Sequence, residues 1–136
     1  MIRHLDHVAV AVREAAPRLA FYRDVLGLPL VRSEEVPDEK VRVTILGSGP
    51  GRLELLEPTA PDSPVGRFLD QRGEGIHHLC YLVDSVASSC ATLSQAGYRL
   101  VGGIRRGSEG TLIAFLHPKD TGGVLIELRE AEGSRP

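Results

Sequence analysis

Two histidines and two glutamates in this chain are of the types that bind divalent metal ions. His7 lies in LDHVAVAV, and Glu54 follows it by 47 residues in RLELLEP. His78 lies in IHHLCYLV, and Glu127 follows it by 49 residues in GGVLIELR. Imidazole nitrogens and carboxylate oxygens are common ligands of divalent ions, and four of them can complete one site. Because the set occurs twice at nearly the same interval, we expect two copies of one structural unit.

The residues beside each histidine are small. Alternate side chains of a strand share a face, so His7 shares a face with Ala9, and His78 shares one with Cys80. Small neighbours leave space for a ligand next to each imidazole. Glu127 stands among apolar residues in GVLIEL, where a buried carboxylate needs a cation or a hydrogen-bond donor. The pattern therefore favours a metal site.

Each of these residues also has an alternative interpretation. A single strand histidine can be a hydrogen-bonded core residue, and Glu54 in LELLE also fits an exposed strand edge. The spacing does not choose between His77 and His78. Mixed nitrogen and oxygen ligands suit Co²⁺ or Mn²⁺, which we favour, and also Ni²⁺, Zn²⁺ or Mg²⁺. A six-coordinate ion with four protein ligands keeps two positions open, as a catalytic Lewis acid requires.

Apolar periodicity and turn residues predict the same order of elements in both halves: a strand, a helix and three strands. In the first half these elements cover residues 4–12, 14–26, 28–33, 41–46 and 52–57. In the second half they cover residues 76–83, 85–96, 98–103, 111–117 and 123–129. Gly27 and Gly97 are the expected helix ends. Such an order can also arise by chance, so the case for a repeat rests on order and spacing.

The segment between the halves, about residues 58–75, is expected to be a connector with its own short helix. Ser63 followed by Pro64 matches an N-cap and a first helical position, which predicts a helix near 64–71. We therefore predict one α+β domain over residues 1–136. Module one covers about 4–57 and module two about 76–130.

Bulk properties exclude several classes of protein. The net charge of −2 gives no basic field for nucleic acid or an anionic membrane surface. No apolar run approaches the roughly 18 residues of a membrane span, and the N-terminus has no signal-peptide core. The two cysteines, Cys80 and Cys90, do not form a disulfide framework. These features predict a cytoplasmic protein without nucleic-acid or membrane partners.

Several stretches resemble a known superfamily. DHVAVAV and FYRDVLGL are similar to the vicinal oxygen chelate (glyoxalase/bleomycin resistance) superfamily in general. The runs APDSP, RGEGIHH and HPKDTGGVLIEL are similar to its methylmalonyl-CoA epimerase family in particular. The resemblance implies paired βαβββ modules forming a cupped, eight-stranded mixed sheet around a divalent metal, usually in a homodimer. It also implies that His7, Glu54, His78 and Glu127 are the metal ligands.

The resemblance further implies a reaction. An epimerase of this family interconverts (2R)- and (2S)-methylmalonyl-CoA by removing the C2 proton through a metal-stabilised enolate, so the partner would be a small acyl-CoA substrate. Glu127 is the first candidate for the base, and Glu54 is the candidate on the opposite face. Strand 41–46, where the family has been proposed to carry a second glutamate, holds no carboxylate here.

Two other functions remain open at this point. The His-Glu-His-Glu set also resembles glyoxalase I, a lactoylglutathione lyase. A metal-free binding module, similar to the antibiotic-sequestering members of the superfamily, need not keep this set.

Overall fold

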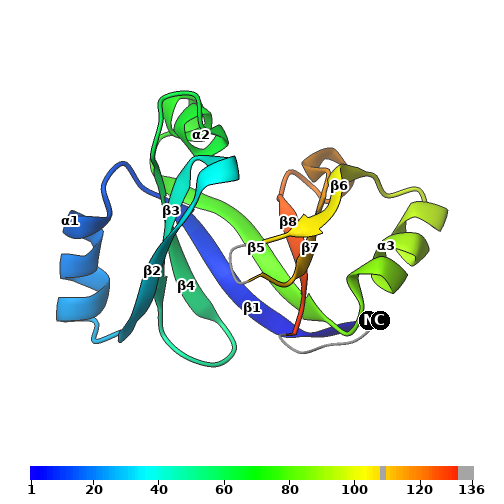
Figure 1. Cartoon of the computed structure of the whole chain (residues 1–136), viewed down its shortest axis with the longest axis horizontal. Coiled ribbons are helices and arrows are strands. Elements are labelled where there is room, and N and C mark those ends of the chain that lie inside the picture. Colours follow the sequence, from blue (N-terminus) through cyan, green and yellow to red (C-terminus); the bar gives the residue numbers. More distant parts are fainter. Residues whose placement is uncertain (108–109, 132–136) are drawn as a thin grey trace. The chain divides into compact units, whose positions relative to one another are not determined.

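The computed structural model describes residues 1–107 and 110–131, and Figure 1 traces their elements in chain order. The first half contains β1 (Ile2–Ala11), α1 (Ala15–Leu19), β2 (Leu30–Val36), β3 (Val41–Leu46) and β4 (Arg52–Pro58). A π-helical segment, Ala20–Val25, continues α1. The connector contains α2 (Pro64–Arg72). The second half contains β5 (Gly75–Val83), α3 (Val86–Gln95), β6 (Leu100–Arg106), β7 (Leu112–Leu116) and β8 (Ile126–Glu130).

This order confirms the prediction of strand, helix and three strands in both halves. The largest differences concern β2 and β6, which begin and end later than the predicted strands 28–33 and 98–103. Both lie at the ends of the sheet, and polar residues such as Arg32 and Glu34 give β2 no apolar alternation that would mark its limits. The Leu28 N–H donates to the Tyr22 carbonyl oxygen over 3.0 Å, which holds the residue after Gly27 against the helix and delays β2.

The eight strands form one mixed sheet in the order β2-β3-β4-β1-β5-β8-β7-β6. β1 pairs with β4 in parallel and β5 with β8 in parallel. The pairs β2–β3, β3–β4, β6–β7 and β7–β8 are antiparallel. This topology confirms the predicted α+β class with two βαβββ modules.

Contacts divide the chain into two compact units. His7–His77 form one unit, and Met1–Asp6 with the described residues from His78 onward form the other. β1 and β5 therefore each contribute residues to both units. Among the described residues, no helix is long and apolar enough to cross a bilayer.

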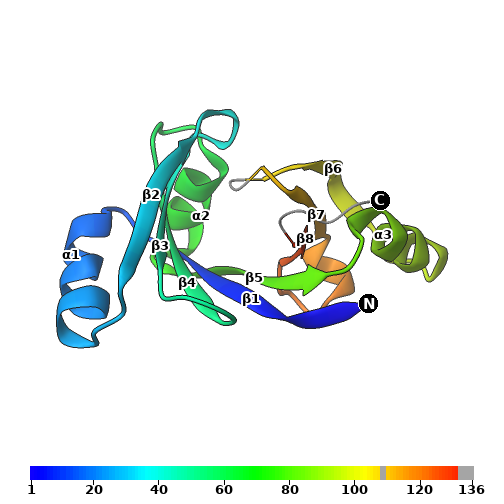
Figure 2. The ribbon, with the colours of Figure 1, turned by 60° about the horizontal axis from the view of Figure 1, so that its bottom comes forward.

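In the first module, helices cover both faces of the strands (Figure 2). One face packs against the helical segment 15–25, through Val12, Leu46 and Leu55 of the strands and linker with Leu19 and Tyr22. The other face packs against α2, through Ala9, Ala11, Val43, Ile45 and Leu56 of the strands with Val65 and Leu69 of the helix. The Ser63 hydroxyl accepts a 2.8 Å hydrogen bond from the Gly66 N–H, which confirms the predicted N-cap of α2.

In the second module, α3 packs against β6, β7 and β8 (Figure 1). Its Val86 and Cys90 form a buried core with Val83, Ala114 and Leu128 of the strands. Because side chains alternate along a strand, residues next to Leu128, such as Glu127 and Arg129, point to the face away from α3.

Candidate functional site

The two histidine–glutamate pairs arise from the same strand register. The β1–β4 pairing places Ala9 opposite Glu54, two residues after His7. The β5–β8 pairing places Cys80 opposite Glu127, two residues after His78. A spacing of two residues keeps the side chain on the same face of the strand. Each module therefore brings one imidazole and one carboxylate together on neighbouring parallel strands.

In the first module the pair is tight and buried. His7 Nδ1 lies 3.1 Å from Glu54 Oε2, and the two side chains are 4% and 5% exposed. Glu54 is therefore not on an exposed strand edge, the alternative that its sequence context left open. The pair lies on the face covered by α2. His7 shares its strand face with Ala9 and Glu54 shares its face with Leu56, and both Ala9 and Leu56 pack against α2.

In the second module the same pairing occurs with a different ring nitrogen. His78 Nε2 lies 2.9 Å from Glu127 Oε1, and the side chains are 7% and 9% exposed. The ring of Phe115 contacts the His78 imidazole edge to face, with centroids 5.4 Å apart. His77 instead packs its ring against Phe68 of α2, at 4.9 Å. His78, and not His77, is therefore the histidine that lies beside Glu127.

A second glutamate in each module ties the last strand of the module to the helix that precedes it in the chain. Three residues after Glu54, the Glu57 carboxylate accepts a hydrogen bond from the Ala15 N–H at the start of α1, at 3.2 Å. Three residues after Glu127, the Glu130 carboxylate accepts one from the Val86 N–H at the start of α3, at 2.8 Å. Carboxylates are favourable at helix N-termini because backbone N–H groups there lack intrahelical partners. This repeated contact fixes both glutamate strands relative to their helices.

The face that carries Glu127 also holds a buried ion pair. Arg129 Nη1 donates to Asp6 Oδ1 over 2.9 Å, and Arg129 Nε donates to Thr111 Oγ1 over 3.2 Å. Asp6 and Arg129 are 5% and 8% exposed. Sequence reasoning did not single out this network, although a charged residue inside an apolar strand, as at Asp6, is the signal that marks it.

Each pair has the donor chemistry that a divalent metal requires. A neutral imidazole offers one nitrogen lone pair and a carboxylate offers anionic oxygens. Buried carboxylates are normally neutralised by cations or metals. The predicted residues are thus brought together within each module as one nitrogen and one oxygen donor, and they fit a metal of the mixed-ligand class.

Comparison with known proteins gives a consistent result. Residues 4–128 match the family described as Glyoxalase/Bleomycin resistance protein/Dioxygenase superfamily. The mitochondrial methylmalonyl-CoA epimerase of Mus musculus is 40% identical, over 93% of this chain and 72% of that protein. The ethylmalonyl-CoA/methylmalonyl-CoA epimerase of Cereibacter sphaeroides is 37% identical, over 96% and 99%. A solved structure of methylmalonyl-CoA epimerase in complex with methylmalonyl-CoA and NH₄⁺ has a TM-score of 0.92 at 34% identity, covering 99% of both chains.

Proposed function

The chain belongs to the glyoxalase/bleomycin resistance protein/dioxygenase superfamily, and we propose that it is an epimerase that interconverts (2R)- and (2S)-methylmalonyl-CoA. The likeness to epimerases along nearly the whole chain supports the substrate and the reaction. The observation that carries the mechanism is the buried histidine–glutamate pair at the same register in both modules.

We propose that His7, Glu54, His78 and Glu127 hold one divalent ion together, with Co²⁺ or Mn²⁺ as the favoured metals. When bound, such an ion would supply a Lewis acid for the thioester and carboxylate oxygens of the substrate. Two neutral imidazoles and two carboxylates carry two negative charges, so a divalent cation would neutralise charges that are costly to bury. The equal register of the two pairs supports a shared role for them.

The reaction also needs groups that move a proton at C2. In our proposal the Glu127 carboxylate forms an O–H bond with the C2 proton, and the electron pair of the broken C–H bond passes into the thioester carbonyl as a planar enolate. Glu54, released from the ion and protonated for this step, then gives a proton to the opposite face of C2 and becomes a carboxylate again. The product has the inverted configuration, and the reverse reaction exchanges the two roles.

Two features support Glu54 as the second base. It is the only carboxylate on β4 apart from Glu57, whose oxygen accepts the α1 N–H. The neighbouring strand β3 carries none, since its residues are VRVTIL. Glu54 and Glu127 come from different modules, and the mechanism requires one base on each face of C2.

Isotope exchange tests this function directly. Protein loaded with Co²⁺ or Mn²⁺ is incubated with methylmalonyl-CoA in D₂O, and deuterium at C2 is followed by NMR. We expect exchange with either metal and loss of exchange after chelation. Absence of exchange with all five candidate metals would rule the epimerase function out.

Two further assays on the same protein distinguish the epimerase from the lyase and from the binding module. Turnover of the glutathione–methylglyoxal hemithioacetal without C2 exchange would assign a lactoylglutathione lyase, the function that the His-Glu-His-Glu set also resembles. Protein that is purified without chelator, contains no metal and is indifferent to chelators would instead be a binding module.

We further propose a cytoplasmic homodimer, on the resemblance to the family and on the two buried cysteines, Cys80 and Cys90, which are not joined in a disulfide and so suit a reducing compartment. Light scattering coupled to size exclusion chromatography measures the mass in solution. A mass equal to the chain's 14.7 kDa would contradict the dimer.

A further inference from the structure

Arg105 contacts an aromatic ring that in turn contacts the candidate site. Its guanidinium carbon lies 5.2 Å from the centroid of the Phe115 ring. The same ring meets the His78 imidazole with centroids 5.4 Å apart and the ring planes at 86°. His78 Nε2 lies 2.9 Å from Glu127 Oε1. These four residues belong to one compact unit and form a continuous row of contacts from a cation to the Glu127 carboxylate.

Strand register places this row on one face of the sheet. The β7–β8 pairing sets Phe115 directly opposite Glu127, where Cβ atoms are about 5 Å apart. The β6–β7 pairing sets Arg105 opposite Ile113, two residues before Phe115. Residues two apart share a face of the strand. Arg105 and Phe115 therefore lie on the face that carries Glu127, away from α3.

A bulge with two glycines gives the Arg105 guanidinium its place. The pairing advances from Val101 to Arg105 on β6 while β7 advances by only two residues. Gly102 and Gly103 lie in this bulge with φ of 78° and 72°, which favours glycine. Arg105 Nη1 donates to the Val101 carbonyl oxygen over 3.4 Å, and a Cβ at position 102 would lie 2.8 Å from that nitrogen. Bulges beside active sites often re-aim a side chain, and here that side chain is Arg105.

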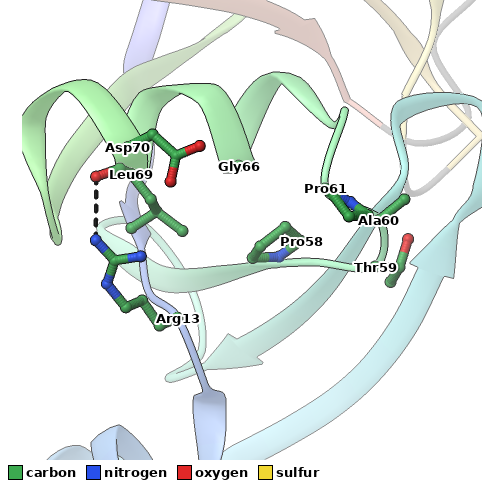
Figure 3. Close-up of a pocket in the computed structure, with 8 residues that line it drawn as sticks. All are labelled: Arg13, Pro58, Thr59, Ala60, Pro61, Gly66, Leu69 and Asp70. Carbon is green, nitrogen blue, oxygen red and sulfur yellow. Dashed lines mark hydrogen bonds between the residues drawn. The ribbon is translucent and has the colours of Figure 1, made fainter.

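Arg13, in the other unit, provides a contrast. Its Nη2 donates to the carbonyl oxygen of Leu69 over 3.2 Å, at a pocket of about 430 Å³ beside α2, as the dashed line in Figure 3 marks. That partner is a helix backbone group, whose position does not depend on the arginine. Phe115 is a side chain with rotamers of its own, so a cation attracted to its ring restricts them. Arg105 can therefore influence the orientation of its partner.

The orientation of the His78 ring matters for a metal. An imidazole binds an ion through one nitrogen lone pair, so the ring must point that nitrogen at the ion. Groups that fix the ring of a histidine ligand contribute 10–100-fold to metal affinity or activity. Glu127 contacts the His78 imidazole through Nε2, and Phe115 bounds the ring on another side.

We propose that Arg105 is a positioning residue of the metal site. Its guanidinium holds Phe115 against the His78 imidazole, and Phe115 keeps the imidazole in the orientation that binds the ion. The inference rests on the proposed function in one respect, the metal site to which His78 would contribute. The charge of Arg105 alone would repel a metal ion, so its removal would strengthen metal binding. The positioning role has the opposite sign.

Metal affinity is the first test. Mn²⁺ is titrated calorimetrically into the full chain in about 1 M salt, where a Debye length of about 3 Å screens the charge of Arg105. Arg105→Met keeps an unbranched apolar side chain and removes the cation. We expect its Kd for Mn²⁺ to rise about twofold to thirtyfold, the equivalent of a cation–π contact. Phe115→Leu should raise the Kd about 10–100-fold, and Arg105→Lys, which keeps a cation, should retain most of the parent affinity.

Arg106→Met is the matched control. It makes the same change at the next residue of β6, whose Nη1 donates to the Gly110 carbonyl oxygen over 2.6 Å, and it should leave the Kd unchanged. The double variant Arg105→Met/Phe115→Leu should bind no more weakly than Phe115→Leu, because the cation acts through the ring. A Kd of Arg105→Met equal to or below that of the parent, or additive losses in the double variant, would overturn the proposal. Thermal unfolding of each variant shows that the fold is kept.

A second measurement reads the contact without metal. In the chelated full chain, the ring current of Phe115 should shift the NMR signals of the His78 Cδ2 and Cε1 protons. Phe115→Leu should remove this shift, Arg105→Met should reduce it, and Arg106→Met should keep it. A parent that binds no divalent ion would defeat the metal site of the proposed function, and these signals would still decide whether Arg105 orients His78. Identical His78 signals in the parent and in Arg105→Met would overturn the inference.

Discussion

The two modules place histidine and glutamate at the same register but surround them with different chemistry. In module one, the residue two positions after Glu54 is Leu56, which packs against α2. In module two, the corresponding residue after Glu127 is Arg129, which forms a buried ion pair with Asp6. Both modules keep a glutamate on the last strand that accepts the first N–H of the helix of the same module. The strand pairing and the helix cap are thus repeated, whereas the surroundings of the glutamate are not.

This difference shows which parts of the repeat are constrained. The connector helix α2 lies between the modules in sequence and packs its Val65 and Leu69 into the core of module one. The two glutamates consequently lie in different electrostatic surroundings although their backbone positions correspond. Two acid–base groups with distinct surroundings are suited to distinct roles.

The strongest test of the comparison removes one glutamate at a time. Glu127→Gln and Glu54→Gln are each expected to lower kcat for epimerisation by about 10²–10⁴-fold, the usual contribution of a general acid or base. If each serves one epimer, a variant should still exchange the C2 proton of the other epimer in D₂O while interconversion is lost.

The matched controls are Glu130→Gln and Glu57→Gln, which make the same change three residues further along. They should keep kcat and lower only stability, by about 0.5–2 kcal/mol as for other caps. If the Glu127→Gln or Glu54→Gln protein keeps a near-normal kcat for epimerisation, the substituted residue is not an acid or base in the reaction.

A second test concerns the ion pair of Arg129, whose counterpart in module one is the apolar Leu56. Arg129→Leu is expected to lower the free energy of unfolding by about 3–5 kcal/mol, because it leaves Asp6 buried without its partner. The double variant Asp6→Leu/Arg129→Leu should recover most of this loss, since an apolar pair avoids the desolvation of charge. Urea unfolding measures both. An equal loss in single and double variants would show that the ion pair is not the cause.

A third test concerns the α2 cover of module one. A Cβ at Gly66 would lie 3.1 Å from the Pro61 carbonyl oxygen and 3.3 Å from Ser63 Oγ. Gly66→Ala should therefore displace the start of α2 and lower stability by about 1–3 kcal/mol, the usual cost of overpacking. Gly75→Ala is the control, since a Cβ there meets nothing within 4 Å. Equal melting temperatures for the two variants would argue against this tight contact.

The smallest expected effect lies in the turn between β7 and β8. Arg99 donates to both Asp120 oxygens and lowers the pKa of that carboxyl from 3.8 to about 2. Because the pKa is lowered on folding, the contact stabilises the protein above pH 4 and is lost as the pH falls toward 2. Asp120→Asn should be less stable than the parent at pH 7 and equal to it only well below pH 2, by urea unfolding. A difference that does not change with pH would contradict this.

Sequence reasoning predicted the repeat because periodicity and turn residues are local signals. Strand 41–46 has the predicted bounds, and Gly27 ends the first helical segment with a φ of 83°. The edge strand β2 was placed less well, since its exposed polar residues carry no alternation. The Asp6–Arg129 pair joins residues 123 positions apart, and no local pattern encodes which distant charge meets which. The metal, the dimer and the single domain stay predictions.

Carrying both histidine–glutamate pairs on one polypeptide has a genetic consequence. In an assembly of two identical chains, every substitution changes both halves at once, so the two environments must stay equal. A tandem arrangement within one gene lets each half accumulate its own replacements, as Leu56 and Arg129 illustrate, while the covalent link keeps the halves at high effective concentration.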